Sequence, residues 1–119
     1  MDRKDLEQIL PHRPPMLLLD QAELRDGEAR ASYLVRGDEF FLQGHFPGHP
    51  VVPGVILCEM MAQACCVLLQ NEMSASATPY YTGIQQVKFR EKVQPGDALE
   101  IRCSLSNRKP PFYFAKGTV

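Results

Sequence analysis

The segment 55–69 constrains the fold most, because apolar side chains surround almost its whole circumference. A proline-glycine pair at 53–54 can open a helix here, since the N–H that proline lacks has no intrahelical partner in the first turn. At about 100° per residue, Glu59, Gln63 and Gln70 fall within about 40° of one another and form one thin polar stripe. We therefore predict a helix from the proline-glycine pair to about Gln70, and the rest of the chain must wrap it.

The residues on either side of this helix have the patterns of short strands separated by turns. An Arg-Asp-Gly sequence at 25–27 supplies the turn of a hairpin, and Pro-Gly-Asp at 95–97 marks another turn. We expect a short helix at residues 2–9 and strands at 16–20, 28–36, 80–93, 98–106 and 112–119. These elements predict an α+β domain in which a curved antiparallel sheet covers one long helix.

Length and charge favour one domain, residues 1–119, with no strongly charged surface overall. The 119 residues are 45% hydrophobic, which is enough for a single core. The 13 basic and 14 acidic residues give no overall electrostatic basis for binding nucleic acid or an anionic membrane. The charged N-terminus lacks a secretory pattern, and no apolar run reaches the ~20 residues of a membrane span. We expect a cytoplasmic protein.

The spacing of the cysteines and histidines matches no common metal site, so no metal is predicted. The cysteines are Cys58, Cys65, Cys66 and Cys103. Three of them fall in the apolar helix segment, which is typical of buried free thiols in a reducing compartment. The serines lack the context of a catalytic nucleophile, and no glycine-rich loop matches a phosphate-binding fingerprint.

Residues 40–54 contain too much glycine and proline for regular structure, so we predict a shaped loop, a common place for functional residues. His45 lies between Gly44 and a Phe-Pro-Gly turn at 46–48, a setting in which an imidazole can transfer protons. His49 is a second candidate. The residue pattern does not choose between them, and either is compatible with an ordinary loop histidine.

Glu59 and Gly54 are the other candidate functional residues. Burial on an apolar helix disfavours the charged form of Glu59, which suits a general acid. The alternative is a structural carboxylate paired with a buried arginine or with backbone N–H groups. The Gly54 N–H, at the positive end of the helix, can stabilise an oxyanion. Together with a histidine, these groups suit proton abstraction next to a carbonyl with loss of a leaving group.

Six motifs are specific enough to compare with known families. They are Leu-Pro-His-Arg-Pro-Pro-Met-Leu-Leu-Leu-Asp at 10–20, Gly-His-Phe-Pro-Gly-His-Pro at 44–50, Pro-Gly-Val at 53–55, Glu-Met-Met-Ala-Gln at 59–63, Val-Lys-Phe-Arg at 87–90 and Val-Gln-Pro-Gly-Asp at 93–97. They closely resemble the motifs of FabZ-type (3R)-hydroxyacyl-[acyl-carrier-protein] dehydratases. The resemblance implies a hotdog fold, dehydration of a 3-hydroxyacyl thioester to the trans-2-enoyl product in fatty-acid biosynthesis, and no cofactor.

The resemblance also implies the roles of single residues. His45 removes the α-proton, Glu59 protonates the departing hydroxyl, the Gly54 N–H polarises the thioester carbonyl, and the Val51 carbonyl orients the His45 ring. A glutamate at position 59 indicates the simple dehydratase, since the related FabA-type enzymes that also isomerise the double bond carry aspartate there. Each site is expected across the interface of a homodimer, with a trimer of dimers as the larger assembly.

The expected partner is acyl carrier protein, an acidic protein that would dock on a local basic patch. The candidates for this patch are Lys88, Arg90, Lys92, Arg108 and Lys109.

The chain lacks the last strand with which family members usually end, so we expect an uncovered sheet edge at residues 112–119. Two alternatives remain open: a hotdog acyl-thioesterase, and a non-catalytic protein that binds acyl groups or acyl carrier protein.

Overall fold

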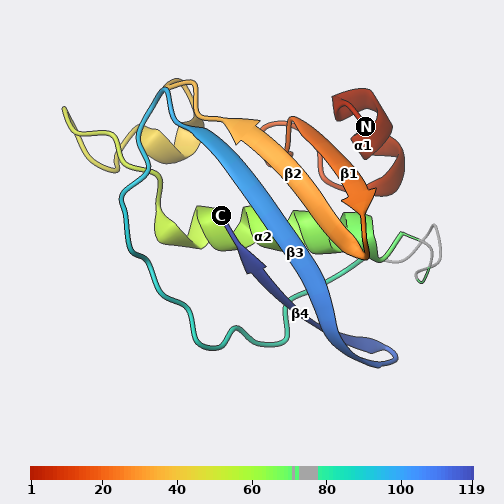
Figure 1. Cartoon of the computed structure of the whole chain (residues 1–119). Helices are drawn as coiled ribbons and strands as arrows, with labels where there is room; N and C mark the ends of the chain where they lie inside the picture. The colour runs from red at the N-terminus through yellow and green to blue at the C-terminus, as the bar shows by residue number, and fades with distance from the viewer. Residues whose placement is uncertain (71, 73–77) are drawn as a thin grey trace.

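The computed structural model describes residues 1–70, 72 and 78–119, and Figure 1 shows their arrangement. The helices are α1 (Arg3–Ile9), the short 3-10 helix η1 (Phe40–Leu42) and α2 (Gly54–Leu68). The strands are β1 (Gln21–Arg25), β2 (Glu28–Leu34), β3 (Ala98–Lys109) and β4 (Phe112–Thr118). They form one antiparallel sheet in the order β1-β2-β3-β4. No helix in these ranges is long and apolar enough to cross a membrane.

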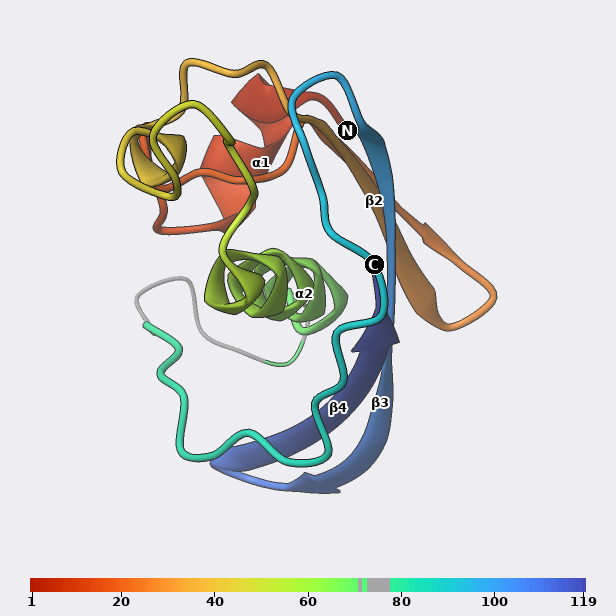
Figure 2. The same ribbon diagram turned by 90° about the vertical axis from the view of Figure 1, so that its left-hand side faces the viewer.

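The core lies between α2 and the sheet, and Figure 2 shows the sheet curving around one side of the helix. Along β2 every second side chain is buried, as a strand with one covered face requires. The buried side chains that α2, β2 and β3 contribute include Met60, Ala64, Val67, Ala29, Ala31, Tyr33, Ile101 and Cys103. The prediction of an α+β fold with a long helix against a curved antiparallel sheet is confirmed.

The local sequence predicts the first helix and the first hairpin correctly. The helix α1 begins with a capping box, in which Asp2 accepts from the Asp5 N–H at 3.0 Å and Asp5 accepts from the Asp2 N–H at 3.1 Å. Asp26 and Gly27 join β1 to β2 with φ angles of 53° and 78°. Positive φ at both central residues is what a tight two-residue hairpin turn needs. The strand β2 ends at Leu34, two residues earlier than expected.

The strand predicted at 16–20 is wrong, although its three leucines are buried. The three leucines at 17–19 are at most 2% exposed, in an extended segment outside the four-stranded sheet. The Leu18 N–H donates to Gln63 Oε1 at 2.9 Å, and Gln63 Nε2 donates to the Met16 carbonyl at 2.8 Å. A buried side-chain amide on α2 therefore satisfies the backbone groups that a neighbouring strand would otherwise pair.

The strand predicted at 80–93 is also wrong. Residues 78–93 run past α2 as an irregular segment without strand pairing, as Figure 2 shows, with bends at Gln86 and Glu91. The segment is held where the Tyr81 hydroxyl donates to the Cys58 carbonyl at 2.9 Å and the Val52 N–H donates to the Val93 carbonyl at 2.8 Å. A strand needs a neighbouring strand to pair with. In the described chain β4, the last strand of the sheet, pairs only with β3 and not with this segment.

The last two strands form a longer hairpin than the sequence predicts. The strand β3 extends to Lys109 instead of ending near residue 106, and only Pro110 and Pro111 separate it from β4. The β3–β4 register shifts between Leu105 and Asn107, as at a β-bulge. The strand β4 agrees with the expectation for 112–119, and its large side chains Phe112 and Phe114 are about half exposed.

Candidate active site

The loop between η1 and α2 holds His45 through both its backbone and its ring. The Val51 N–H donates to the His45 carbonyl at 2.8 Å, and His45 Nδ1 lies 2.8 Å from the Val51 carbonyl oxygen. The Phe46 ring stacks on the imidazole, with the two centroids 4.1 Å apart. Mutual backbone hydrogen bonds between Phe46 and His49, at 2.9 and 3.0 Å, close the tip of the loop. The orientation of the imidazole is therefore fixed by residues of its own loop.

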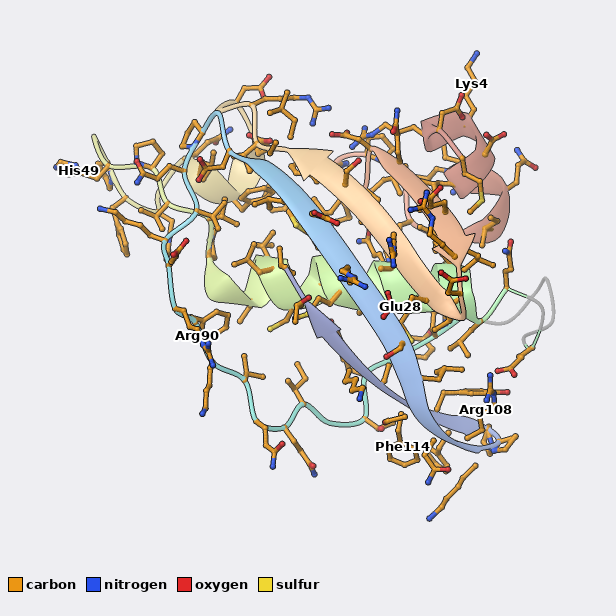
Figure 3. All side chains as sticks on the ribbon, in the orientation of Figure 1. Lys4, Glu28, His49, Arg90, Arg108 and Phe114 are labelled. Atoms are coloured by element: carbon orange, nitrogen blue, oxygen red, sulfur yellow. The ribbon has the colours of Figure 1, made fainter. Side chains whose placement is uncertain are left out.

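The Val51 contact determines which ring nitrogen of His45 carries the hydrogen. A carbonyl oxygen can only accept, so the hydrogen bond requires the hydrogen to be on Nδ1. In the neutral ring this leaves the lone pair of Nε2 free to take a proton. His49, in contrast, is exposed, and Figure 3 shows it at the outer tip of the loop. The geometry thus separates two histidines that the sequence pattern leaves equivalent.

The helix α2 begins at Gly54, immediately after this loop. The first N–H groups of a helix have no intrahelical acceptor, so the Gly54 N–H can donate to a bound group. The Phe89 ring lies over this residue: a Cβ atom at position 54 would lie 2.7 Å from two of its carbons. Glycine is therefore needed here while Phe89 keeps its place, and the motif at 87–90 packs against the start of α2.

Glu59 lies about one and a half turns further along α2. Its Oε1 is 3.4 Å from His12 Nε2 and 3.5 Å from Gln63 Nε2, and its side chain is 20% exposed. The carboxylate is thus less enclosed than the apolar helix pattern indicates. Tyr81 and Cys66 also face it: burial, with smaller contributions that include the Glu59 charge, raises the pKa of Cys66 to about 12 and that of Tyr81 above its usual value.

His45 and Glu59 have different side-chain partners in the described chain. The contacts of His45 are with Val51 and Phe46, whereas those of Glu59 are with His12 and Gln63. No hydrogen bond or ion pair joins the two candidate groups in the described part of the chain. Within one chain, the two candidate side chains therefore have separate polar contacts.

The five basic candidates lie in two places. Lys88, Arg90 and Lys92 belong to the segment that reaches the start of α2, whereas Arg108 and Lys109 lie at the β3–β4 turn. Figure 3 shows Arg90 and Arg108 far apart on the molecule. Arg108 is also engaged, since its Nε lies 2.6 Å from a Glu72 carboxylate oxygen. The structure does not bring the five side chains together as one patch.

The four cysteines are free thiols. Between α2 and β3, a thiol hydrogen bond lowers the pKa of Cys65 and raises that of Cys103. In residues 1–70, 72 and 78–119, no group of three or more His, Cys, Asp or Glu side chains is arranged to hold a metal ion.

Sequence reasoning missed the neighbours of Glu59. The sequence patterns single out neither His12 nor Gln63 as a contact of Glu59, and they place Gln63 only in the polar stripe. Both residues lie inside the motifs at 10–20 and 59–63, and the structure shows that these two motifs touch through His12, Gln63 and Glu59. The only sequence signal for this contact is that the same chain contains both motifs.

A comparison with known protein families gives the relationship. The sequence model of the FabA-like domain matches residues 10–119. The chain belongs to this family. The FabZ 3-hydroxyacyl-[acyl-carrier-protein] dehydratase of Oenococcus oeni is 45% identical over 112 residues, covering 92% of this chain and 81% of the relative. The enzyme of the same name from Caldicellulosiruptor saccharolyticus is 43% identical over 120 residues, covering 98% and 86%.

A solved structure is also similar to this FabA-like chain. A chain of the dehydratase heterocomplex ApeI:P from Xenorhabdus doucetiae superposes with a TM-score of 0.78 and 28% sequence identity, over 94% of this chain and 78% of that chain. The predicted hotdog fold and the resemblance to FabZ-type dehydratases are confirmed.

Proposed function

We propose that this FabA-like chain dehydrates a 3-hydroxyacyl group, carried as a thioester on acyl carrier protein, to the trans-2-enoyl product in fatty-acid biosynthesis. The curated relatives from Oenococcus oeni and Caldicellulosiruptor saccharolyticus are named for this activity. The observation that carries the proposal is the His45 ring, whose Nδ1 is held by the Val51 carbonyl and whose Nε2 is left free as a base. A base fixed in this way suits removal of a weakly acidic proton.

The reaction is an elimination of water. His45 Nε2 removes a proton from C2, next to the thioester carbonyl, while the Gly54 N–H donates to the carbonyl oxygen as negative charge develops there. Protonated Glu59 gives its proton to the hydroxyl on C3, which leaves as water as the C2–C3 double bond forms. Transfer of a proton from the His45 imidazolium to the Glu59 carboxylate, through solvent, restores the enzyme. The balance of atoms and electrons requires no cofactor.

The complete site forms across a two-fold dimer, with His45 from one chain and Glu59 from its partner. The separate contacts of these two residues within one chain support this arrangement. The segment 78–93 also leaves large apolar side chains uncovered, with Tyr80 at 84% and Ile84 at 55% exposure, and a second subunit can bury such a surface. Three such dimers make the larger assembly that the family resemblance implies.

Acyl carrier protein docks beside the start of α2 in this proposal. Lys88, Arg90 and Lys92 belong to the segment that packs there, and an acidic partner is attracted by such a local group of positive charges. Arg108 and Lys109 are less suited, because they lie at the β3–β4 turn and Arg108 already has an acidic partner. The proposed location is the cytoplasm.

The decisive test is an assay on a 3-hydroxyacyl thioester of acyl carrier protein. We expect the absorbance of the conjugated enoyl thioester to rise without release of free thiol. Release of thiol without the enoyl product would instead identify a thioesterase, and binding without either product would identify an acyl-binding protein. Either result would refute the dehydratase proposal.

A further inference from the structure

His12 is the polar side chain of the 10–19 segment that reaches Glu59. Its Nε2 lies 3.4 Å from Glu59 Oε1, and each of the two side chains is 20% exposed. The other ring nitrogen, Nδ1, is buried and has no hydrogen-bond partner among the described residues. An imidazole with one buried, unpaired nitrogen is costly to keep inside a protein, so its single polar contact needs an explanation.

The backbone around His12 is held firmly in place. Arg13 reaches back with its guanidinium to the His12 carbonyl at 2.7 Å and to the Leu10 carbonyl at 2.9 Å. Further along the segment, the Gln63 amide bonds the backbone of residues 16 and 18 at 2.8 and 2.9 Å. Hydrogen bonds therefore hold the segment on both sides of His12, and those of Gln63 come from α2.

Both polar neighbours of Glu59 meet the same carboxylate oxygen. His12 Nε2 and Gln63 Nε2 approach Oε1, at 3.4 and 3.5 Å, and the described residues offer no hydrogen bond to Oε2. A side-chain amide nitrogen donates, and so does the Nε2–H tautomer of His12, so both neighbours can act as donors toward Oε1. In the mechanism proposed above, Oε2 is then the oxygen without a protein partner that can carry the proton to the substrate.

We propose that His12 is a positioning residue that holds the Glu59 carboxyl group in one orientation and stabilises the carboxylate left after proton transfer. The inference rests on the proposed function, in which Glu59 is the acid. A glutamate on a helix otherwise samples several rotamers, and an imidazole held 3.4 Å from Oε1 restricts that freedom before substrate arrives. The other titratable groups at Glu59 are the Tyr81 hydroxyl and the Cys66 thiol, whose raised pKa values keep both neutral.

The test compares two amide substitutions that differ in reach. In His12→Gln the side-chain nitrogen can occupy the place of Nε2, whereas in His12→Asn it reaches only the place of Nδ1. We expect His12→Asn to lower kcat about tenfold to a hundredfold with KM changed less than twofold, as for loss of a hydrogen bond to a charged group. His12→Gln should keep kcat within about threefold of wild type, and so should the control His49→Ala on the exposed loop.

A double-mutant cycle then asks whether His12 acts through Glu59. His12→Asn should cause no further loss in the Glu59→Gln background. An equal loss in both backgrounds, equal kcat values for the Asn and Gln variants, or an effect on KM alone would each overturn the positioning role. Full activity of Glu59→Gln would instead refute the assignment of Glu59 in the proposed function. Loss in Glu59→Gln with no loss in His12→Asn would refute only the inference about His12.

Discussion

Replacing Gln63 by methionine should strongly destabilise the fold, because this side chain is the only fully buried polar one in the described core. Methionine has a similar length and volume, so the change creates little cavity. What it removes is the acceptor for the Leu18 N–H and the donor to the Met16 carbonyl. These two backbone groups lie outside the sheet, so no neighbouring strand can replace the lost hydrogen bonds.

The expected cost follows from the burial of the two hydrogen bonds. The bond to the Leu18 N–H is fully buried, so an unpaired N–H there costs about 1–3 kcal/mol. The bond to the Met16 carbonyl is only partly buried, and water can replace some of it. We therefore expect a loss of about 2–4 kcal/mol in the free energy of unfolding, a large share of the roughly 5–15 kcal/mol typical of a domain.

Urea unfolding at one fixed protein concentration measures this loss, and hydrogen exchange of the Leu18 amide reports it locally. The matched control is Gln8→Met, the same substitution at an exposed position of α1, which should change stability by no more than about 0.5 kcal/mol. If Gln63→Met were as stable as this control, or if the Leu18 amide kept its protection, the Gln63 side chain would not be what holds the 10–19 segment on α2.

Three further predictions follow from the proposed function. His45→Ala and Glu59→Gln should each lower the dehydration rate by roughly 10² to 10⁴, as expected for loss of a proton-transfer group, whereas His49→Ala costs much less; a more sensitive His49 would contradict the assignment. Charge reversal within residues 88–92 should weaken turnover of carrier-bound substrate, but not of a small thioester analogue, and far more than reversal of Arg108; equal effects would remove the docking patch. Co-assembly of the His45→Ala and Glu59→Gln subunits should restore about a quarter of wild-type activity, because half of the dimers are mixed and each has one intact site of two; no recovery would mean that each site lies within one chain.

Local sequence patterns were sufficient wherever the structure depends on neighbours in the sequence. The helix α2 was predicted from its apolar circumference and its Pro-Gly start, and the β1–β2 hairpin from the turn chemistry of Asp26 and Gly27. The loop that carries His45 was also predicted from its glycine and proline content, although Phe40–Leu42 at the start of the predicted range forms the 3-10 helix η1. In each case the determining interactions lie within a few residues of one another.

The incorrect strands at 16–20 and 80–93 share one cause. Apolar runs with strand-forming residues show that a segment can be extended and buried, but a strand exists only if another strand lies beside it. At 16–20 the partner of the backbone is a glutamine side chain on α2, and at 80–93 no strand pairs with the segment in the described chain. The sequence of a segment does not show whether a partner strand is present, since strand pairing is a property of the tertiary structure.

The polar stripe of α2 explains both the success and the omission at the candidate site. Glu59 was selected because a carboxylate stands out on an apolar helix, and the same reasoning applies to Gln63 one turn later. A polar group on a buried helix must find a partner, and the extended segment at 10–19 brings its own unpaired backbone groups and His12 to that stripe. The polar stripe is thus the face of α2 that contacts the 10–19 segment, which lies outside the sheet. Gln63 holds the 10–19 segment on α2 through two backbone hydrogen bonds, so its replacement should first lower the free energy of unfolding. His12 lies beside the carboxylate of the proposed acid, so its replacement should first lower kcat.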